Sequence, residues 1–261
     1  MSYQDYEVEI SESQLGKVFS GIKGLCLLGG WAVYITVNKS FSLSRGRNYV
    51  GSRDIDLGFH VDAKWSESQL KGSLFATTVG HLEKIGFAPL NFRLVKYFHT
   101  ETRKELSAQE ARATPQHLMF DHYIDPIVDN IHPKTKQVLG FVPIDEPLLS
   151  HVFSGGRYTT MEAFGGTFIL PKPEVLLATK INSVPNRDKE HKRVKDVADI
   201  YALLWHSDEK LPTLRAKLRR LMSSDRISCV VSSLNEQDYA AASVSTGVEK
   251  SEISRVIGEL A

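Results

Sequence analysis

Hydrophobic and polar positions in the first two thirds of the chain follow two different spacings. Apolar residues recur at helical intervals through residues 11–22, whereas polar and apolar residues alternate through 54–59, as in a half-buried strand. Residues 38–53 are polar and basic and predict a loop. The spacing predicts helices over 11–22, from Trp31 to Val37 and over 66–85, and strands over 24–28, 54–59, 92–98, 118–124 and 165–170.

The pattern becomes entirely helical after Pro171. Pro173 fits the first turn of a helix, and Pro185 fits its end. We therefore expect an α+β protein with a domain over residues 1–170 and a helical C-terminal domain over 171–261. The predicted helices of the second part span 173–184, 188–205, 211–222, 236–243 and 249–260.

The composition indicates where the protein is located, but it does not indicate an activity. Hydrophobic residues make up 42% of the chain, and 32 Lys and Arg nearly balance 31 Asp and Glu, so net charge indicates no polyanionic partner. Cys26 and Cys229 each lie in an apolar run, which predicts buried, reduced thiols. The acidic N-terminus is no signal peptide, and no apolar run approaches the ~20 residues of a membrane span. We expect a cytoplasmic protein with no membrane partner.

The main chemical feature is the pair Asp54 and Asp56. In a strand, residues i and i+2 point to the same face, so the two carboxylates would lie side by side. Neighbouring carboxylates repel unless a cation lies between them, and magnesium prefers such oxygen ligands together with substrate phosphates. Gly29-Gly30, after a buried strand and before a helix, would let backbone N–H groups approach a phosphate.

A third carboxylate should come from a neighbouring strand, and two candidates are present. Asp121 lies among apolar residues in the middle of the predicted strand 118–124, where a carboxylate is costly unless it is paired or binds metal. Asp125 shares its face but follows the end of that strand, before Pro126. We favour Asp121 as metal ligand and general base, and keep Asp125 as the alternative.

A second polar cluster lies in the helical part. Lys195, Asp196 and Asp199 fall off the apolar stripe of the helix over 188–205, and Lys195 and Asp199 are spaced to pair directly. A solvated charged face is the simplest explanation for a helix of this kind. Lys180, near the end of the preceding helix, is the other cationic candidate.

Together these segments resemble the AbiEii-type nucleotidyltransferases, a branch of the DNA polymerase β-like superfamily that includes toxins of type IV toxin–antitoxin systems. Their order and spacing agree with that family from about residue 28 to 204. The matching segments are Leu28-Gly29-Gly30-Trp31-Ala32-Val33, Arg53-Asp54-Ile55-Asp56-Leu57, Pro173-Glu174-Val175-Leu176-Leu177-Ala178-Thr179-Lys180, Arg187 and Lys195-Asp196-Val197-Ala198-Asp199-Ile200.

The resemblance implies a nucleotidyltransferase fold, a small mixed sheet flanked by helices, followed by the helical domain. It implies that Asp54 and Asp56 bind two Mg²⁺ ions, and that the helical domain contributes Lys180 and Asp199 to the site. Lys180 would neutralise phosphate charge, and Asp199 would orient it. The residues expected to bind the nucleotide are Gly29, Gly30, Ser52, Arg53, Lys180 and Arg187.

The implied reaction transfers an NMP from an NTP to an acceptor hydroxyl. Basic residues near 45–53, 189–195 and 215–220 favour an RNA acceptor, such as a tRNA 3′ end, and toxin relatives imply a protein antitoxin as partner. An aminoglycoside-type small-molecule acceptor is the alternative reaction, and it would require an acidic pocket. A non-catalytic module that binds NTP or RNA is the alternative outside enzymes.

Overall fold

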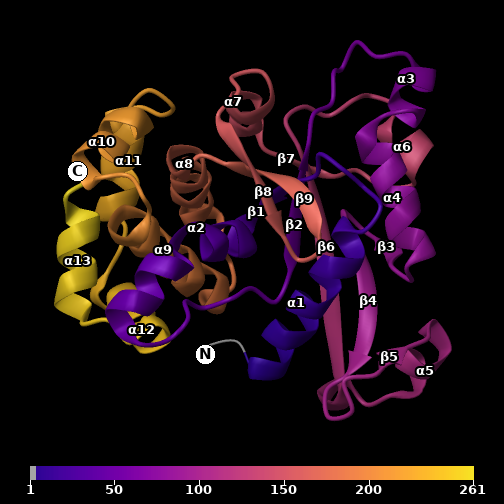
Figure 1. Ribbon diagram of the computed structural model, residues 1–261, viewed down its shortest axis with the longest axis horizontal. Helices are drawn as coiled ribbons and strands as arrows, with labels where there is room; N and C mark the ends of the chain where they lie inside the picture. The colour runs from indigo at the N-terminus through magenta and orange to yellow at the C-terminus, as the bar shows by residue number, and fades with distance from the viewer. Residues whose placement is uncertain (1–3) are drawn as a thin grey trace. The chain divides into compact units, whose positions relative to one another are not determined.

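The computed structural model describes residues 4–261 and divides into two compact units (Figure 1). Residues 4–28 and 52–170 form the sheet unit, and residues 29–51 and 171–261 form the helical unit. Both units draw on separated stretches of chain. Residues 29–51, placed in the first domain by sequence, group with the C-terminal helices instead.

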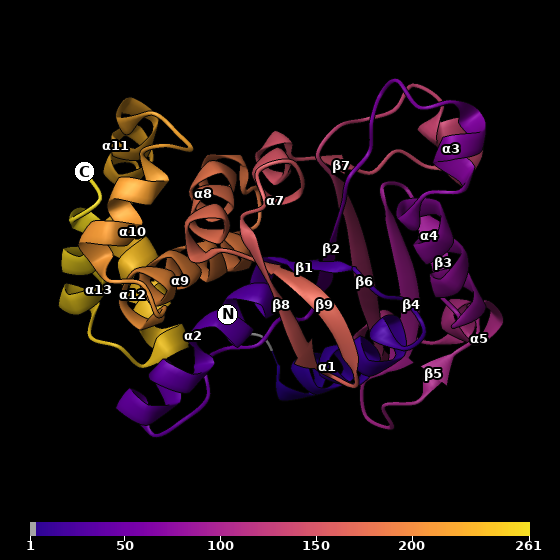
Figure 2. The same cartoon turned by 45° about the horizontal axis from the view of Figure 1, so that its top comes forward.

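The strands of the described chain form one mixed, nine-stranded sheet (Figure 2). Its main path runs β3-β4-β6-β2-β1-β9-β8, with β5 paired to β4 and β7 to β6. The pairs β2–β6, β1–β9 and β6–β7 are parallel. The strands are β1 (Cys26–Leu28), β2 (Ile55–Phe59), β3 (Ala88–Leu90), β4 (Arg93–His99), β5 (Glu105–Leu106), β6 (Met119–Val128), β7 (Ile144–Asp145), β8 (Tyr158–Ala163) and β9 (Gly166–Pro171).

One face of the sheet is apolar, and helices α1 (Asp5–Phe19) and α4 (Leu74–Lys84) pack on it. Phe59 of β2 stacks on Phe75 of α4 with ring centroids 4.9 Å apart, and Phe168 of β9 stacks on Phe19 of α1 at 4.6 Å. Because successive residues of a strand point to opposite faces, Asp56 points away from these helices. The shorter helices of this unit are α3 (Glu67–Lys71), α5 (Ala108–Ala113), α6 (Thr135–Leu139), α7 (Ser150–Phe153), η1 (Gln116–Leu118) and η2 (Pro147–Leu149).

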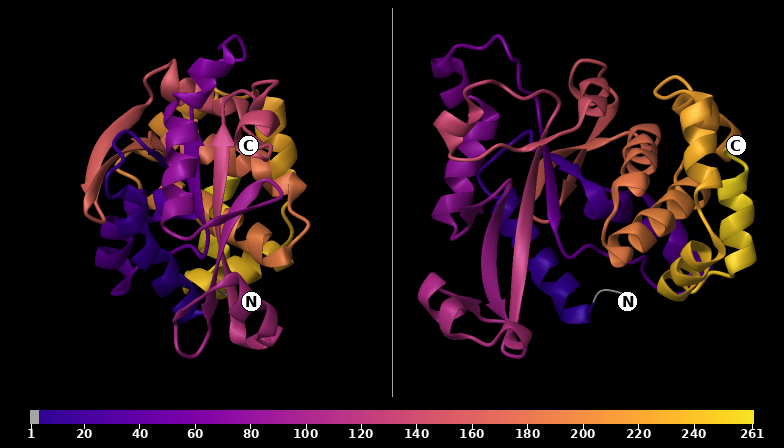
Figure 3. Two further views of the ribbon diagram at one scale, coloured as in Figure 1. Left: turned by 90° about the vertical axis from the view of Figure 1, so that its right-hand side faces the viewer. Right: turned by 180° about the vertical axis from the view of Figure 1, so that it is seen from behind.

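The helical unit is built around α9 (Glu190–His206), which contacts α2, α8, α12 and α13 (Figure 3). Ile200, Tyr201, Ala202 and Leu203 of α9 are all buried, because neighbours surround the helix on several sides. The other helices are α2 (Gly29–Arg45), α8 (Pro173–Ser183), η3 (Val184–Asn186), α10 (Leu211–Leu218), α11 (Ser224–Ser232), α12 (Glu236–Thr246) and α13 (Lys250–Gly258).

Three boundaries differ from the sequence-based prediction for identifiable reasons. Helix α2 continues to Arg45 because Phe41, one turn after Val37, packs against Tyr49 and His206. The predicted helix over 66–85 is interrupted at Gly72, and the side chain of Ser73 then caps α4. Strand β6 runs through Pro126 to Val128 because the parallel neighbour β2 pairs with its second half.

Strand β8 and helix α11 were not predicted. β8 has mostly exposed residues, so it lacks an apolar alternation, and it joins β9 through a Phe164-Gly165 turn in which both residues have positive φ. Cys26 is buried as expected, but Cys229, on α11, is exposed. The expectation of two buried thiols is therefore wrong for Cys229. None of the helices within residues 4–261 combines the length and apolar character needed to cross a membrane.

His122 is a fully buried histidine in the apolar face of β6. Neither ring nitrogen has a hydrogen-bond partner among the described residues. Burial, and then the positive charges of Lys96 and Arg53, lower the pKa of His122 to about 3. Three aromatic rings surround it at centroid distances between 5.7 and 6.1 Å, those of Phe87, Phe98 and Phe120.

This burial predicts an acid-sensitive contribution to stability. In the unfolded chain His122 takes up a proton near its ordinary pKa of 6.5, whereas in the folded protein it does so only near pH 3. Stability from this residue is therefore full above pH 6.5 and decreases as pH falls. We expect it to account for about 2 kcal/mol of the decrease in unfolding free energy between pH 7 and pH 5.

Urea unfolding of His122→Leu at both pH values measures this contribution. The variant should lose about 2 kcal/mol less than the wild type over this range. His117→Leu, at an exposed position, is the matched control and should behave as the wild type. Equal pH dependence of His122→Leu and wild type would contradict the assignment.

Candidate functional site

Two carboxylates lie side by side on the sheet face that points away from α1 and α4. Asp56 on β2 and Asp125 on β6 are register partners on adjacent parallel strands. On its other side, Asp56 is the register partner of Leu28, the last residue of β1. Since register partners share a face and lie about 5 Å apart, the sheet holds these two acidic side chains next to each other.

Asp54 precedes β2 rather than lying in it, so strand alternation does not fix its direction. Burial and Asp121 raise the pKa of Tyr123 most, and the negative charge of Asp54 adds to this effect. Asp54 is buried and lies 3.7 Å from the Arg53 guanidinium. We call Asp54, Asp56 and Asp125 the acidic row, in which the strand register pairs Asp56 with Asp125 and Asp54 precedes them along the chain.

The strand register does not support the preference for Asp121 over Asp125. Asp121 lies four residues earlier on β6, which corresponds to ~13 Å along a strand. Its Oδ2 accepts a hydrogen bond from the Tyr123 hydroxyl at 2.9 Å. Asp125 was considered less suitable because the strand was expected to end before it, but β6 continues past it, and the neighbour of Asp56 is Asp125.

Arginines contact both ends of the acidic row. Arg93 donates from Nη2 to Asp125 Oδ2 at 2.8 Å. Arg53 lies between Glu7, at 3.1 Å, and Asp54, and its guanidinium is 5.1 Å from the centroid of the Phe120 ring. Ser52 beside it is buried. Arg53, expected to touch a nucleotide, is thus paired with acidic residues of its own unit.

Gly29 begins α2 with a φ of 60°, in the left-handed region that favours glycine. It directly follows Leu28, and Gly30 beside it is buried. The first turn of α2 contains no acidic residue. The positive end of this 17-residue helix is therefore not neutralised by its own side chains, which is the condition under which a helix N-terminus favours an anion.

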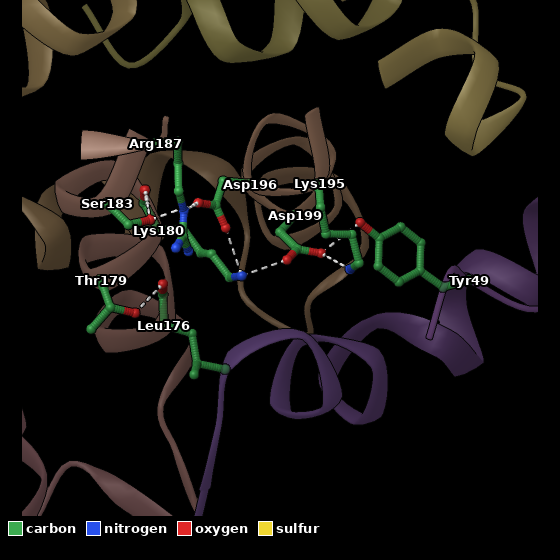
Figure 4. Close-up of polar contacts among 9 residues, drawn as sticks. All are labelled: Tyr49, Leu176, Thr179, Lys180, Ser183, Arg187, Lys195, Asp196 and Asp199. Atoms are coloured by element: carbon green, nitrogen blue, oxygen red, sulfur yellow. Dashed lines mark hydrogen bonds and ion pairs between the residues drawn. The ribbon is translucent and has the colours of Figure 1, made fainter. Parts of the chain in front are cut away.

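Lys180, predicted to meet phosphate, is buried between two carboxylates (Figure 4). Its Nζ lies 2.8 Å from Asp196 Oδ1 and 2.7 Å from Asp199 Oδ2. Asp199 also binds Lys195, four residues before it, and accepts a hydrogen bond from the Tyr49 hydroxyl at 2.8 Å. The predicted pairing of Lys195 with Asp199 is confirmed.

Asp196 joins the same network from the other side. Its Oδ2 accepts from Arg187 Nε at 2.6 Å and from the Ser183 hydroxyl at 2.8 Å. Lys195, Asp196 and Asp199 are all buried, so the explanation of a solvated charged face is wrong for them. The network joins α8, η3, α9 and the segment after α2, and it brings together three cationic and two anionic side chains (Figure 4).

The charges of this network are strongly coupled. Burial opposes the charged form of Lys180, but Asp196 and Asp199 outweigh it and raise its pKa above the ordinary value. Burial would raise the pKa of Asp196, yet Lys180 and Arg187 lower it to about 2. Desolvation lowers the pKa of Lys195 despite its contact with Asp199. Lys180 therefore carries a fixed positive charge at neutral pH and cannot serve as a base.

Sequence reasoning missed several members of these two clusters. Tyr49 lay in a predicted loop, and Arg93 and Ser183 had no motif around them. Arg93 is 32 residues from Asp125 and Tyr49 is 150 residues from Asp199, so only the folded chain brings them together.

The acidic row offers carboxylate oxygens as metal ligands, the ligand type that magnesium prefers. Within residues 4–261, no group of three or more His, Cys, Asp or Glu side chains is arranged to hold a metal ion by itself. A magnesium ion at this row would therefore have two protein carboxylates and would need further ligands from a substrate, which is a common arrangement for this ion.

Comparison with known proteins gives little further information. No family model matches the chain, and no curated protein matches it. A search of solved structures finds the crystal structure of an antigenic nucleotidyltransferase-like protein from Paracoccidioides brasiliensis. It is 16% identical, with a TM-score of 0.41, and the match covers 88% of this chain and 94% of that one. What the protein does has to be inferred from its own residues.

The Lys180 network predicts a large stability effect. Lys180→Met leaves two buried carboxylates without their shared cation, which should lower the unfolding free energy by about 3–5 kcal/mol in urea titrations. Lys71→Met is the matched control, because Lys71 also pairs with a carboxylate but is 60% exposed. Its effect should stay below about 1 kcal/mol. Similar effects of the two substitutions would contradict a structural role for the network.

Proposed function

We propose that the protein is a magnesium-dependent nucleotidyltransferase that moves an NMP from an NTP to an acceptor hydroxyl. The observation that carries this proposal is the acidic row, in which Asp56 and Asp125 are held side by side by adjacent parallel strands and Asp54 precedes them. Like charges held so close repel each other, and a cation between them relieves this repulsion, so carboxylates placed in this way are suited to magnesium and a polyphosphate. The AbiEii-type sequence pattern supports the same reaction class.

In this proposal the side-by-side carboxylates Asp56 and Asp125 hold magnesium, with Asp54 beside them and substrate oxygens completing the ligand set. The ion supplies charge neutralisation at the phosphates and acidifies a bound hydroxyl. The side chains of the row contribute fixed positions, because the backbones of β2 and β6 are hydrogen-bonded to each other and to further strands. Such pre-positioned charge is the main source of rate acceleration in phosphoryl transfer.

Lys180 is proposed to neutralise phosphate charge. Its raised pKa keeps it protonated, and Asp196 and Asp199 hold its amine in place. Asp199 is fully buried and already bonded to Lys180, Lys195 and Tyr49, so it acts as a positioning residue. Arg187 is bound to Asp196 and is proposed to support Lys180 in the same way.

An RNA acceptor remains the preferred acceptor, but the surface that supports it is smaller than expected. Arg45 pairs with Glu252, Arg193 pairs with Asp238, and Lys195 is buried. Each predicted basic stretch keeps at least one exposed basic side chain: Arg47, Lys189, and Arg219 with Arg220. RNA binding by this protein would therefore draw on these exposed side chains.

The first test of the proposed function is pyrophosphate release from each NTP with Mg²⁺ and acceptor. Asp56→Asn and Asp125→Asn should each lower the rate by about a hundredfold or more, because each removes charge from the acidic row. Asp121→Asn should remain close to the wild type. Asp145→Asn, at an exposed position on β7 of the same sheet, is the matched control. Equal rates for Asp125→Asn and wild type would remove Asp125 from the site.

The second test identifies the acceptor by incubating the protein with labelled NTPs, Mg²⁺ and total RNA. We expect label on RNA from the wild type and none from Asp56→Asn. Pyrophosphate release that depends on an aminoglycoside, without labelled RNA, would instead support a small-molecule acceptor. Nucleotide binding without pyrophosphate release under any condition would support a non-catalytic module.

A further inference from the structure

Arg93 has an unusual position beside the acidic row. It is the first residue of β4, directly after a turn at Asn91 and Phe92 in which Asn91 has a positive φ of 56°. Its guanidinium carbon lies 4.3 Å from the ring centroid of Tyr123 and 4.7 Å from that of Phe92. The guanidinium thus contacts two aromatic rings while one of its nitrogens binds Asp125.

The contact between Arg93 and Asp125 is a single hydrogen bond in a buried setting. Nη2 reaches Oδ2 at 2.8 Å, and the Arg93 side chain is 16% exposed. Arg93 Nε is buried and has no hydrogen-bond partner among the described residues. A guanidinium left with an unpaired buried donor is less well satisfied than one bound at two points.

The same protein contains an arginine pair of the fully satisfied kind. Arg193 donates to Asp238 from Nε at 2.7 Å and from Nη2 at 2.9 Å, and it also binds the carbonyl oxygens of Val184 and Ser233. That pair joins three segments of the helical unit, as a structural bridge does. Arg93 makes one bond to one carboxylate and otherwise packs on rings, so the contact with Asp125 is easier to break.

We propose that Arg93 is a displaceable counter-ion of the acidic row. It neutralises Asp125 while no divalent cation is bound, and a cation that binds Asp56 and Asp125 takes over this carboxylate. Arg93 then stays on the rings of Tyr123 and Phe92, which supply an alternative favourable contact for its charge. This inference rests on the proposed metal site but concerns how that site is kept charge-balanced before it is loaded.

The consequence is competition between Arg93 and the metal. An arginine next to a carboxylate stabilises the charged form by one to three pK units, which is about tenfold or more in binding terms. Removing the guanidinium should therefore raise the affinity of the row for a divalent cation roughly tenfold. A purely structural Arg93, which only orients Asp125, would have the opposite effect when removed.

The test is titration of the nucleotide-free, full-length protein with Mn²⁺, followed by the electron paramagnetic resonance signal of the free ion. Arg93→Gln should bind Mn²⁺ roughly tenfold more tightly than the wild type. Arg93→Lys keeps the charge and should stay close to the wild type. Arg255→Gln removes one positive charge from an exposed helix position, where the side chain is 55% exposed, and controls for net charge. Adding Asp125→Asn to Arg93→Gln should abolish the gain.

The possible outcomes distinguish a failure of the Arg93 counter-ion proposal from a failure of the nucleotidyltransferase proposal. Unchanged or weaker Mn²⁺ binding in Arg93→Gln, with binding still lost in Asp56→Asn, overturns the counter-ion and leaves the nucleotidyltransferase proposal standing. A gain equally large in Arg255→Gln also overturns it, because the effect would then be one of net charge. Mn²⁺ binding that is indifferent to Asp56→Asn and Asp125→Asn overturns both.

Discussion

The hydrogen-bonded pairing of β2 with β6 holds two negatively charged side chains close together in the sheet unit. Pairing of β2 with β6 in parallel register places Asp56 beside Asp125 on one face, and their backbone positions cannot separate without disrupting the ladder. The opposite face of the sheet is buried, because it packs against α1 and α4 through stacked phenylalanines. A one-residue slip would reverse both faces, so burial of the apolar face also fixes the position of the carboxylates.

The helical unit also holds charged side chains close together, but it places opposite charges beside each other. Lys180, Asp196 and Asp199 are buried, and they are tolerated because each charge has opposite charges at hydrogen-bond distance. Desolvation opposes the charged forms of Lys180 and Asp196, and their shared contacts outweigh it. In the sheet unit, Arg53 and Arg93 contact the ends of the acidic row, whereas in the helical unit lysines and carboxylates alternate within one buried network.

Local patterns in the sequence were sufficient for features that depend on neighbours along the chain. The strand at 55–59, the start of α8 at Pro173 and the contact between Lys195 and Asp199 all follow from spacing within a few residues. The acidic neighbour of Asp56 could not be identified in this way, because the choice between Asp121 and Asp125 depends on the register of β6 with β2, a strand distant in sequence. Tyr49 and Arg93 were missed for the same reason: their partners are distant in sequence, and an isolated tyrosine or arginine carries no signal.

The chain passes from the sheet unit into the helical unit at Gly29, returns at Ser52 and leaves again after Leu170. A single cut at residue 170 therefore does not separate the two units. A C-terminal fragment would lack α2 and Tyr49, so Phe41 would no longer cover His206 and Asp199 would lose its hydroxyl donor. During synthesis α2 emerges long before α9, its packing partner, and must wait for the last third of the chain. Completion of the helical core therefore waits until the segment that carries α9 has been made.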